Sequence, residues 1–205
     1  MIRKFSYAAI ILILLIILSA CGNQEKSTYK IVLDPGHGGE DVGAVGASGQ
    51  YEKDFTLNVA LKVKERLEQD QRIEVYLTRE DDDYLSLENR HSRHFAKGVD
   101  GFISIHGNAF VESDVSGTET FYNRRNSRAF AKTIHNHVIE ATGFNDRDVQ
   151  KEAFYVLKES KVPAVLLELG FLSNPEEESI MFTEQFQDSV AEAIVAGIEE
   201  YLFNS

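Results

Sequence analysis

The stretch VPAVLLELG, residues 162–170, decides the fold class of this chain. It is the most apolar strand-like run after the N-terminal segment, and a glycine ends it. Short continuous apolar runs are typical of strands that are buried on both faces of a sheet. Its single charged residue, Glu168, needs a partner inside the protein, because burying an unpaired carboxylate costs several kcal/mol. The stretch therefore predicts a central strand and makes Glu168 a candidate functional residue.

On the N-terminal and C-terminal sides of this stretch, short apolar runs alternate with segments in which apolar residues recur with the period of a helix. Together with 162–170, strands are expected at 29–34, 73–78, 101–106, 117–123 and 153–158, and helices at 52–69, 85–97, 127–142 and 184–203. Strands that are separated by helical crossovers form α/β sheets, and ligands bind beyond the carboxyl ends of such strands. We therefore predict a single α/β domain with a mostly parallel or mixed central sheet of about six strands, flanked by helices on both faces.

Composition excludes several classes of protein. The 205 residues include 33 acidic and 21 basic side chains, which gives a formal net charge of -12, and 43% of the residues are hydrophobic. A chain of this length forms one domain, and its apolar content with only three prolines argues against disorder. Gripping a phosphate backbone requires an excess of clustered Lys and Arg, so no nucleic-acid partner is expected.

The N-terminus has the pattern of an export signal. Arg3 and Lys4 precede an apolar run of 11 residues, Ala8 to Leu18, which is too short for a comfortable membrane-spanning helix. The segment Leu18-Ser19-Ala20-Cys21-Gly22 resembles a bacterial lipobox. We expect a signal peptide at 1–20, a lipidated Cys21 with a short polar tether at 21–28, and a catalytic domain at 29–205. A free thiol at Cys21 is the alternative interpretation. The chain would thus be exported and anchored by its lipid to the outer face of the bacterial cytoplasmic membrane, facing the cell wall.

Polar residues lie where the predicted strands open into a ligand crevice. His37 follows the first strand, His106 closes the strand at 101–106, and Glu168 lies near the end of 162–170; Glu52 opens the first long helix. Two imidazoles and one carboxylate are a familiar ligand set for a catalytic zinc ion that keeps a fourth position for water. A histidine at the end of a strand is more often a hydrogen-bonded packing residue. Spacing alone therefore leaves both interpretations open.

Four blocks of sequence are more specific than this spacing. They are DPGHGG (34–39) with Asp41 and Gly43-Ala44, then Glu52-Lys53, then SIHGNA (104–109), and PAVLLELGFLSNPEE (163–177). In this order they resemble the zinc-dependent N-acetylmuramoyl-L-alanine amidases of the Amidase_3 family, and the resemblance runs from about Tyr29 to Phe203. It implies a phosphorylase/hydrolase-like α/β fold.

The resemblance also implies roles for individual residues. His37, Glu52 and His106 would be the ligands of one Zn²⁺ ion per chain, and Glu168 would be the catalytic carboxylate. The reaction would hydrolyse the amide bond between the lactyl group of N-acetylmuramic acid and L-alanine of the stem peptide. The glycines at 36, 38 and 39 would let the backbone turn beside the metal. The expected partners are peptidoglycan glycan strands and stem peptides, and the membrane through Cys21.

Other polar residues carry weaker expectations. Asn108 and Arg147 are candidates for substrate binding, although Arg147, Arg79 and Arg90 also fit solvated surface positions. The family often has Arg-Gly-Val-Lys where this chain reads Arg147-Asp148-Val149-Gln150, which could alter substrate preference. It usually has a small residue such as Ala at the position of Gly107, a mild change.

Further clusters of polar residues are not expected to bind a metal ion. His91 and His94 fit a polar helix face better than a metal site, and the acidic tract 80–83 fits a solvated turn better than a calcium site. His135 and His137 are two residues apart and point to different sides of their helix. The chain from 117–123 to the helix at 127 leaves no room for an inserted inhibitory helix, so we expect an open site that needs no obligate protein partner.

Three other functions compete with an amidase. A zinc peptidase would cut inside the stem peptide, a muropeptide-binding protein would hold it without cutting, and the signal alone also fits a solute-binding lipoprotein. Ligand type favours zinc, although geometry can favour another divalent ion.

Overall fold

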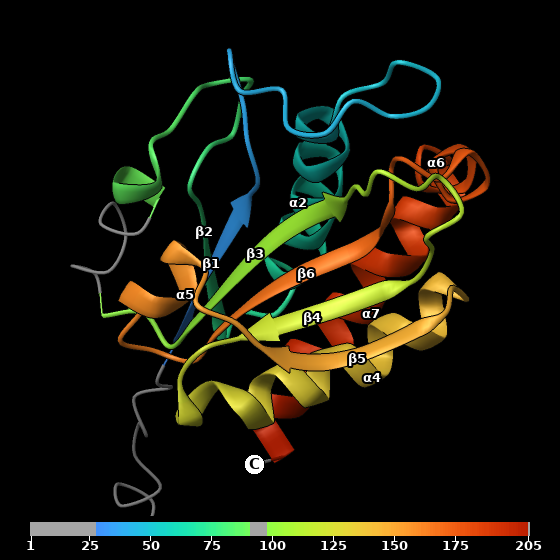
Figure 1. Ribbon diagram of the computed structural model, residues 1–205. Coiled ribbons are helices and arrows are strands. Elements are labelled where there is room, and N and C mark those ends of the chain that lie inside the picture. Colours follow the sequence, from blue (N-terminus) through green and yellow to red (C-terminus); the bar gives the residue numbers. More distant parts are fainter. Residues whose placement is uncertain (1–27, 91–97, 205) are drawn as a thin grey trace, which may run out of the picture.

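Six strands form the central sheet of the computed structural model, which describes residues 28–90 and 98–204 (Figure 1). Across the sheet their order is β2 (Ile73–Leu77), β1 (Tyr29–Pro35), β3 (Gly101–Asn108), β6 (Ala164–Phe171), β4 (Thr118–Tyr122) and β5 (Asp146–Lys151). The first four are parallel, whereas β4 runs antiparallel to β6 and β5 is parallel to β4. The predicted six-stranded mixed sheet is therefore confirmed.

Three long helices cover one face of the sheet and enclose the main core. They are α2 (Glu52–Leu67), α4 (Arg128–Thr142) and α7 (Glu184–Asn204). Val59, Ile134 and Ile194 pack from these helices against Ile103 and Leu167 of the central strands, and all five are fully buried. The strands read as continuous apolar runs because both of their faces are covered.

The opposite face is covered by a much shorter element. Helix α5 (Tyr155–Glu159) places Val156 and Leu157 against Phe102 and Leu166 in a second, smaller core. Helices thus flank both faces, as expected. The remaining elements are a 3-10 turn (Arg125–Ser127) before α4 and α6 (Pro175–Met181) after β6.

One predicted strand is wrong. Residues 153–158 were expected to form a strand, but Tyr155–Glu159 is helical, and the neighbouring strand is Asp146–Lys151. Five of the six residues of β5 are exposed, because this strand lies at the edge of the sheet, so no apolar pattern marks it.

Parts of two predictions lie outside the described residues. The expected helix at 85–97 is helical at 87–90, and positions 91–97, with His91 and His94, are not described. The expected signal peptide and Cys21 also lie outside. None of the described helices has the length and apolarity that a membrane span requires.

Candidate active site

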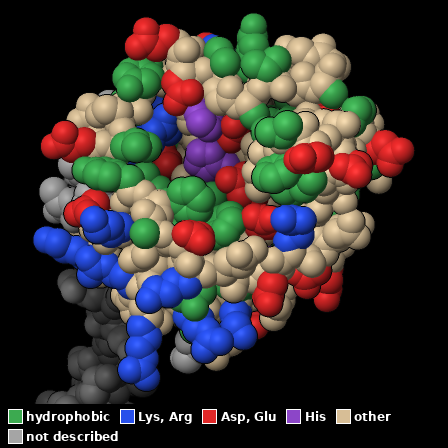
Figure 2. All heavy atoms as spheres, viewed as in Figure 1, with side chains coloured by type: hydrophobic (Ala, Val, Ile, Leu, Met, Phe, Trp, Pro, Cys, Tyr) green, Lys and Arg blue, Asp and Glu red, His purple; other side chains and the backbone are tan. Residues whose placement is uncertain are grey.

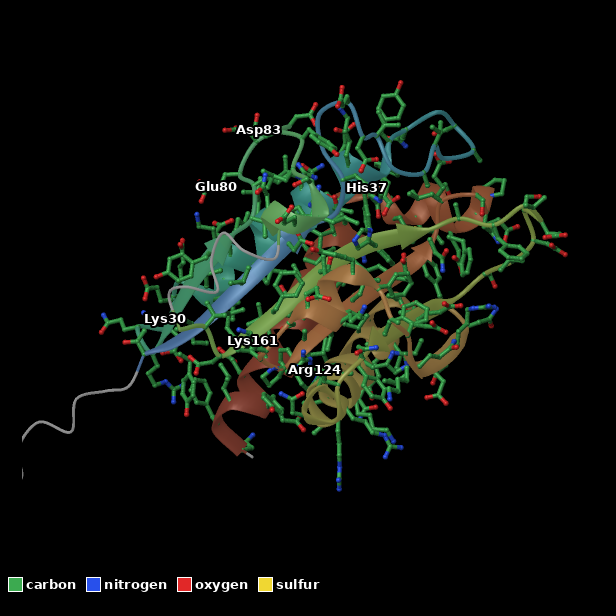
Figure 3. The ribbon with its side chains drawn as sticks, turned by 60° about the vertical axis from the view of Figure 1, so that its left-hand side comes forward. Lys30, His37, Glu80, Asp83, Arg124 and Lys161 are labelled. Atoms are coloured by element: carbon green, nitrogen blue, oxygen red, sulfur yellow. The ribbon has the colours of Figure 1, made fainter. Side chains whose placement is uncertain are left out.

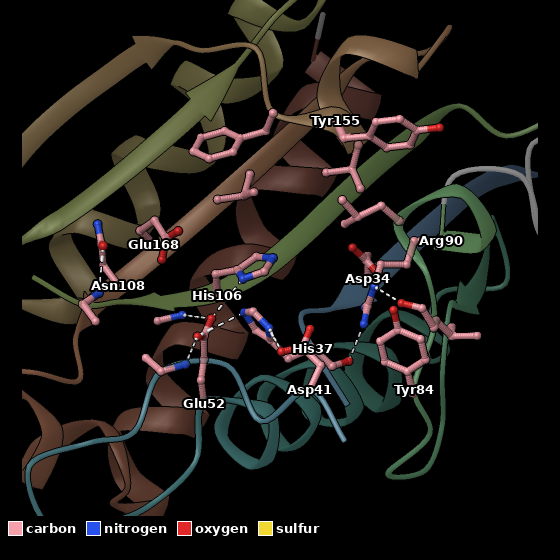
Figure 4. Close-up of a pocket in the computed structure, with 18 residues that line it drawn as sticks. Asp34, His37, Asp41, Glu52, Tyr84, Arg90, His106, Asn108, Tyr155 and Glu168 are labelled. Carbon is pink, nitrogen blue, oxygen red and sulfur yellow. Dashed lines mark hydrogen bonds and ion pairs between the residues drawn. The ribbon is translucent and has the colours of Figure 1, made fainter. Parts of the chain in front are cut away.

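Two histidines and a glutamate converge at the carboxyl edge of the parallel strands (Figure 4). His37 follows β1, His106 belongs to β3, and Glu52 is the first residue of α2. One ligand atom of each lies within 4.8 Å of the others. The Oε2 atom of Glu52 lies 3.1 Å from Nε2 of His37, and its Oε1 atom lies 2.9 Å from Nδ1 of His106. A proton or a cation has to occupy each of these short gaps.

The backbone around His37 is shaped to admit this cluster. His37 adopts a φ of 60°, a left-handed conformation that non-glycine residues seldom adopt. A Cβ atom on Gly36 would lie 2.3 Å from the ring of His106, and one on Gly43 would lie 2.6 Å from Oε2 of Glu52. Both glycines are therefore needed for the close approach of the three side chains. Unusual backbone of this kind is concentrated at functional sites.

Glu52 is held as a buried carboxylate. It is 4% exposed, and its oxygens accept hydrogen bonds from the backbone N–H groups of Ala44 and Gly107. Burial alone would raise the pKa of Glu52, but hydrogen bonds and charge from His106 and His37 outweigh it and hold the pKa well below its usual range. Glu52 is therefore ionised when it faces the imidazoles.

His37 has a second carboxylate partner. Its Nδ1 atom lies 2.9 Å from Oδ1 of Asp41. Burial lowers the pKa of His37, but the hydrogen bonds and charges of Glu52 and Asp41 raise it more, so its pKa lies above the ordinary value. Asp41 fixes Nδ1 as the donor, which leaves Nε2 directed at Glu52.

A buried chain of hydrogen bonds orients His106. Its Nε2 atom lies 3.1 Å from the Ser104 hydroxyl, and that hydroxyl donates to Oδ2 of Asp34 at 2.8 Å. Asp34 is fully buried and also accepts from Thr78 and Arg90. Since the single hydroxyl proton of Ser104 goes to the carboxylate, Ser104 can only accept from His106. This makes Nε2 the protonated nitrogen and leaves Nδ1 for Glu52 or a metal.

Glu168 lies beside this cluster on the next strand. It is the register partner of His106 between β3 and β6, and both residues line the same cavity. Its Oε2 atom is buried and accepts no hydrogen bond within the described part of the chain. Burial, together with the charges of Glu52 and Glu119, raises the pKa of Glu168 well above its usual value. A half-buried carboxyl whose buried oxygen accepts no hydrogen bond among the described residues, next to a candidate metal cluster, is poised to exchange a proton with a ligand.

The cluster opens into a cavity of about 400 Å³. Figure 2 shows the histidines in a hollow bordered by apolar side chains. Tyr84 and Leu87 border the cavity on one side, and Phe154 and Tyr155 border it near α5 (Figure 4). All four are exposed. The site therefore combines a polar floor with an apolar, aromatic rim, as ligand pockets usually do.

Of the two residues predicted to contact the substrate, Asn108 lines the cavity and Arg147 does not. Asn108 lines the cavity at the end of β3. Arg147 is not among the residues that line it: its guanidinium forms an ion pair with the buried Glu119 and lies over the ring of Phe171. The geometry thus favours Asn108 over Arg147 as a residue that a ligand would touch.

Arg79 and Arg90 are buried, so the surface interpretation of these two residues is wrong. Arg79 donates to the carbonyls of Pro35 and Gly36, and Arg90 to those of Pro35 and His37. They hold the loop that carries His37.

The residues outside the predicted site have local partners. His135 is buried between Thr120 and Asp146, and His137 forms an ion pair with Glu200. In the acidic tract, Glu80 pairs with Lys64 and Asp82 pairs with Lys53. Each of these contacts agrees with a structural role.

Sequence reasoning assigned no role to Asp34, Asp41 or Ser104. Asp34 and Asp41 were part of the quoted blocks, but their contacts depend on the fold. Ser104 carried a signal that could have been used: it stands two residues before His106 in an apolar strand, so both side chains point to the same face.

Comparison with known proteins agrees with this geometry. The family model described as N-acetylmuramoyl-L-alanine amidase matches residues 31–200. The uncharacterized protein YqiI of Bacillus subtilis is 41% identical over 175 residues, which are 83% of this chain and 84% of YqiI. The probable cell wall amidase LytH of Staphylococcus aureus is 40% identical over 174 residues, which cover 83% of this chain and 57% of LytH.

A solved structure shows the same fold. The catalytic domain of CwlV, an N-acetylmuramoyl-L-alanine amidase from Bacillus (Paenibacillus) polymyxa, superposes with a TM-score of 0.84 at 46% identity, over 85% of this chain and 98% of that domain. The family match, these identities and the shared fold together establish that the chain belongs to the N-acetylmuramoyl-L-alanine amidase family, whose members are hydrolases of the bacterial cell wall.

Proposed function

We propose that this chain hydrolyses the amide bond between the lactyl group of N-acetylmuramic acid and L-alanine of the peptidoglycan stem peptide, in a zinc-dependent reaction. The observation that carries the proposal is the convergence of His37, Glu52 and His106 beside Glu168, whose buried Oε2 atom accepts no hydrogen bond among the described residues. Family membership supplies the substrate class.

The three converging side chains fit a zinc ion. Two neutral imidazoles and one carboxylate are a usual donor set of catalytic zinc, and a fourth position is left for a ligand from solution. Nε2 of His37 and Nδ1 of His106 would be the donors, because Asp41 and Ser104 engage the other ring nitrogens. When bound, zinc would supply Lewis-acid chemistry, polarising the scissile carbonyl and lowering the pKa of water.

Glu168 would act as the proton carrier. In its ionised form the carboxylate takes a proton from the attacking water, and in its protonated form it delivers that proton to the leaving amine of L-alanine. Its raised pKa keeps the proton available for the second step. Asn108, on the cavity wall, is the proposed contact to the substrate.

We also propose that the chain acts outside the cytoplasm as a lipoprotein. The N-terminal segment with its lipobox-like sequence supports export and lipidation at Cys21, and the relative LytH is described as a cell wall amidase. The signal peptide at 1–20, the tether at 21–28 and the absence of an obligate protein partner stay predictions. Radiolabelled-lipid incorporation into the wild-type chain but not into Cys21→Ser would support the anchor.

Product analysis tests the catalytic proposal. Residues 22–205 are incubated with purified peptidoglycan, with and without a chelator, and the products are identified by mass. We expect stem peptides with a free N-terminal alanine. They should disappear with the chelator, return with added zinc, and fall by about 10²- to 10⁴-fold in Glu168→Gln, which should still bind zinc.

Other products would contradict the proposal. Cleavage inside the stem peptide would identify a peptidase. Zinc binding with retention of muropeptides, and no cleavage under any condition, would identify a binding protein.

A further inference from the structure

Positive charge is concentrated in two segments of this acidic chain. Residues 122–132 and 151–161 contain seven of the 21 basic residues but only two of the 33 acidic ones. These seven residues, which we call the basic face, are all exposed: Arg124, Arg125, Arg128, Lys132, Lys151, Lys158 and Lys161. The rest of the chain carries 14 basic and 31 acidic residues. Such asymmetry points to an anionic partner for this part of the surface.

The fold brings the two segments together at one edge of the sheet. The segment that begins at Arg124 follows the end of β4, Lys151 ends β5, and Lys161 precedes β6, which runs in the opposite direction. The guanidinium of Arg124 donates to the carbonyl of Lys158, and Ala164 N–H donates to the Ser127 hydroxyl at 3.0 Å. Figure 2 shows basic side chains gathered below the hollow that holds the histidines.

The charges of the basic face are not neutralised within the described residues. None of the seven forms an ion pair there, whereas Lys53, Lys62 and Lys64 elsewhere on the surface each pair with an acidic side chain. The two acidic residues of these segments, Glu152 and Glu159, form no ion pair with them in the described part of the chain either. The Lys and Arg side chains of the basic face can therefore interact with an anionic partner.

The basic face lies at the end of the domain where the polypeptide enters it. Figure 3 shows Lys30, Arg124 and Lys161 toward the end of the domain opposite His37, Glu80 and Asp83. Lys30 stands at the start of β1. If Cys21 is lipidated as proposed, the eight residues 21–28 span at most about 29 Å, so this end of the domain stays near the membrane.

We propose that the basic face docks on the anionic lipid headgroups of the membrane and turns the catalytic cavity toward the cell wall. The inference rests on the proposed function for its anchor and orientation. Each Lys or Arg close to an anionic membrane strengthens binding by about fivefold. Charges that lie farther away than the Debye length are largely screened. The Debye length is about 8 Å at physiological ionic strength, and the path along β6 from Ala164 to Glu168 alone is about 13 Å.

A membrane fits this surface better than a soluble anionic polymer. None of the seven residues lines the active-site cavity, and the two that Figure 3 labels, Arg124 and Lys161, lie toward the end of the domain opposite His37. An exposed charged surface outside the cavity suits an array of headgroups.

Vesicle binding tests the proposal without the lipid anchor. Residues 28–205 contain the whole sheet and both cores, so they fold as a unit. Binding is measured to vesicles of phosphatidylcholine alone and of phosphatidylcholine mixed with phosphatidylglycerol, at low and high salt. We expect binding only to the mixed vesicles, with loss at high salt.

Two variants of equal net charge locate the binding surface. Arg125→Gln/Arg128→Gln/Lys132→Gln neutralises part of the basic face, and Ser113→Glu/Asn145→Glu/Ser179→Glu adds the same negative charge at exposed positions elsewhere. The first should weaken binding to the mixed vesicles by roughly tenfold or more, and the second should bind nearly as well as the wild type.

Three outcomes would overturn the proposal: no binding to the mixed vesicles, equal binding to both kinds of vesicle, or equal weakening in both variants. Soluble polyphosphate can also be added as a competitor for the basic face. If it displaces the protein from the mixed vesicles as strongly as unlabelled vesicles do at the same phosphate concentration, the face would be reassigned to soluble polymers. Peptidoglycan cleavage in solution is measured on the same proteins. Vesicle binding without cleavage would defeat the proposed function while the docking surface stands.

Discussion

Two clusters in this molecule each combine histidine with a carboxylate, but they differ in whether a ring nitrogen remains for binding a cation. His135 is 4% exposed, and its two ring nitrogens face Thr120 and Asp146. In the cluster of His37, Glu52 and His106, each imidazole uses one nitrogen for a positioning partner and directs the other at a shared carboxylate. The first cluster is complete as it stands, whereas the second has a central position for a cation.

The comparison shows that a carboxylate next to a histidine is weak evidence for a metal site. What distinguishes the two clusters is the convergence of donors on one point, an open cavity, and a nearby carboxyl oxygen, Oε2 of Glu168, that is buried and accepts no hydrogen bond from the described residues. Among the described residues, His135 belongs to no convergent group of donors, and it is closed off from solvent at 4% exposure.

The largest expected difference is between substitutions of one histidine in each of the two clusters. His106→Ala should abolish tight zinc binding and lower activity by at least about three orders of magnitude, because a metal supplies several kcal/mol of transition-state stabilisation. His135→Gln should keep zinc and activity and lower the free energy of unfolding by about 1–3 kcal/mol, through lost buried hydrogen bonds. Zinc titration, cleavage assays and denaturant unfolding measure these quantities. Equal loss of zinc in both variants would erase the distinction.

Steric access to the cluster gives the next prediction. Gly36→Ala places a Cβ atom against the ring of His106, so it should weaken zinc binding by about 100-fold or more, since the ligand must move. Gly49→Ala is the control: its φ of +91° makes the variant strained, but a Cβ atom there meets nothing within 4 Å. It should cost stability and leave zinc affinity unchanged. Unaltered zinc affinity in Gly36→Ala would show that the clash is relieved without moving His106.

The hydrogen-bond chain behind His106 should have a moderate effect. Ser104→Ala removes the acceptor of Nε2, and zinc affinity should fall by about 10- to 100-fold. Thr78→Val removes a different hydrogen bond to Asp34, one that does not connect it with His106. This variant should keep its zinc affinity, as measured by competition with a chromophoric chelator. Comparable zinc affinities in the two variants would count against the tautomer argument.

The smallest expected effect is a shift in the pH profile. Activity requires ionised Glu168, so it falls as the pH drops through the pKa of this residue. Burial and the charge of Glu52 raise that pKa, and the charge of Glu119 raises it further, so Glu119→Gln should move the acidic limb of kcat/KM to lower pH. Asp146→Asn, which removes the partner of His135, should leave the limb in place. A shift to higher pH in Glu119→Gln would contradict the account of Glu168.

Much of the fold was predictable, because β1, β3 and β6 are buried on both faces and read as continuous apolar runs. The edge strand β5 was not, since DRDVQK is exposed and has no apolar face. The run around Tyr155 is helical although its pattern predicts a strand, because a short apolar segment does not distinguish strand from helix. Helix α6 was missed, although Asn174 as N-cap followed by Pro175 is a helix-start signal.

The main residues of the candidate site were predictable, but the residues that position them were not. His37, Glu52, His106 and Glu168 came from family resemblance, because ligands far apart in sequence form no local motif, and the fold brings the first three together. The role of Asp34 depends on the side chains that β3, the end of β2 and the helical segment 87–90 place around it, and no sequence pattern gives that.

Zinc location tests the central claim most directly. Crystals of residues 22–205 grown with zinc are measured at the zinc absorption edge, and anomalous density gives the position and number of the ions. We expect one zinc ion per chain, bound by Nε2 of His37, Nδ1 of His106 and a carboxylate oxygen of Glu52, with Glu168 beside it. Zinc at His135 or at His91 and His94, with the cluster of His37, Glu52 and His106 empty, would contradict the account.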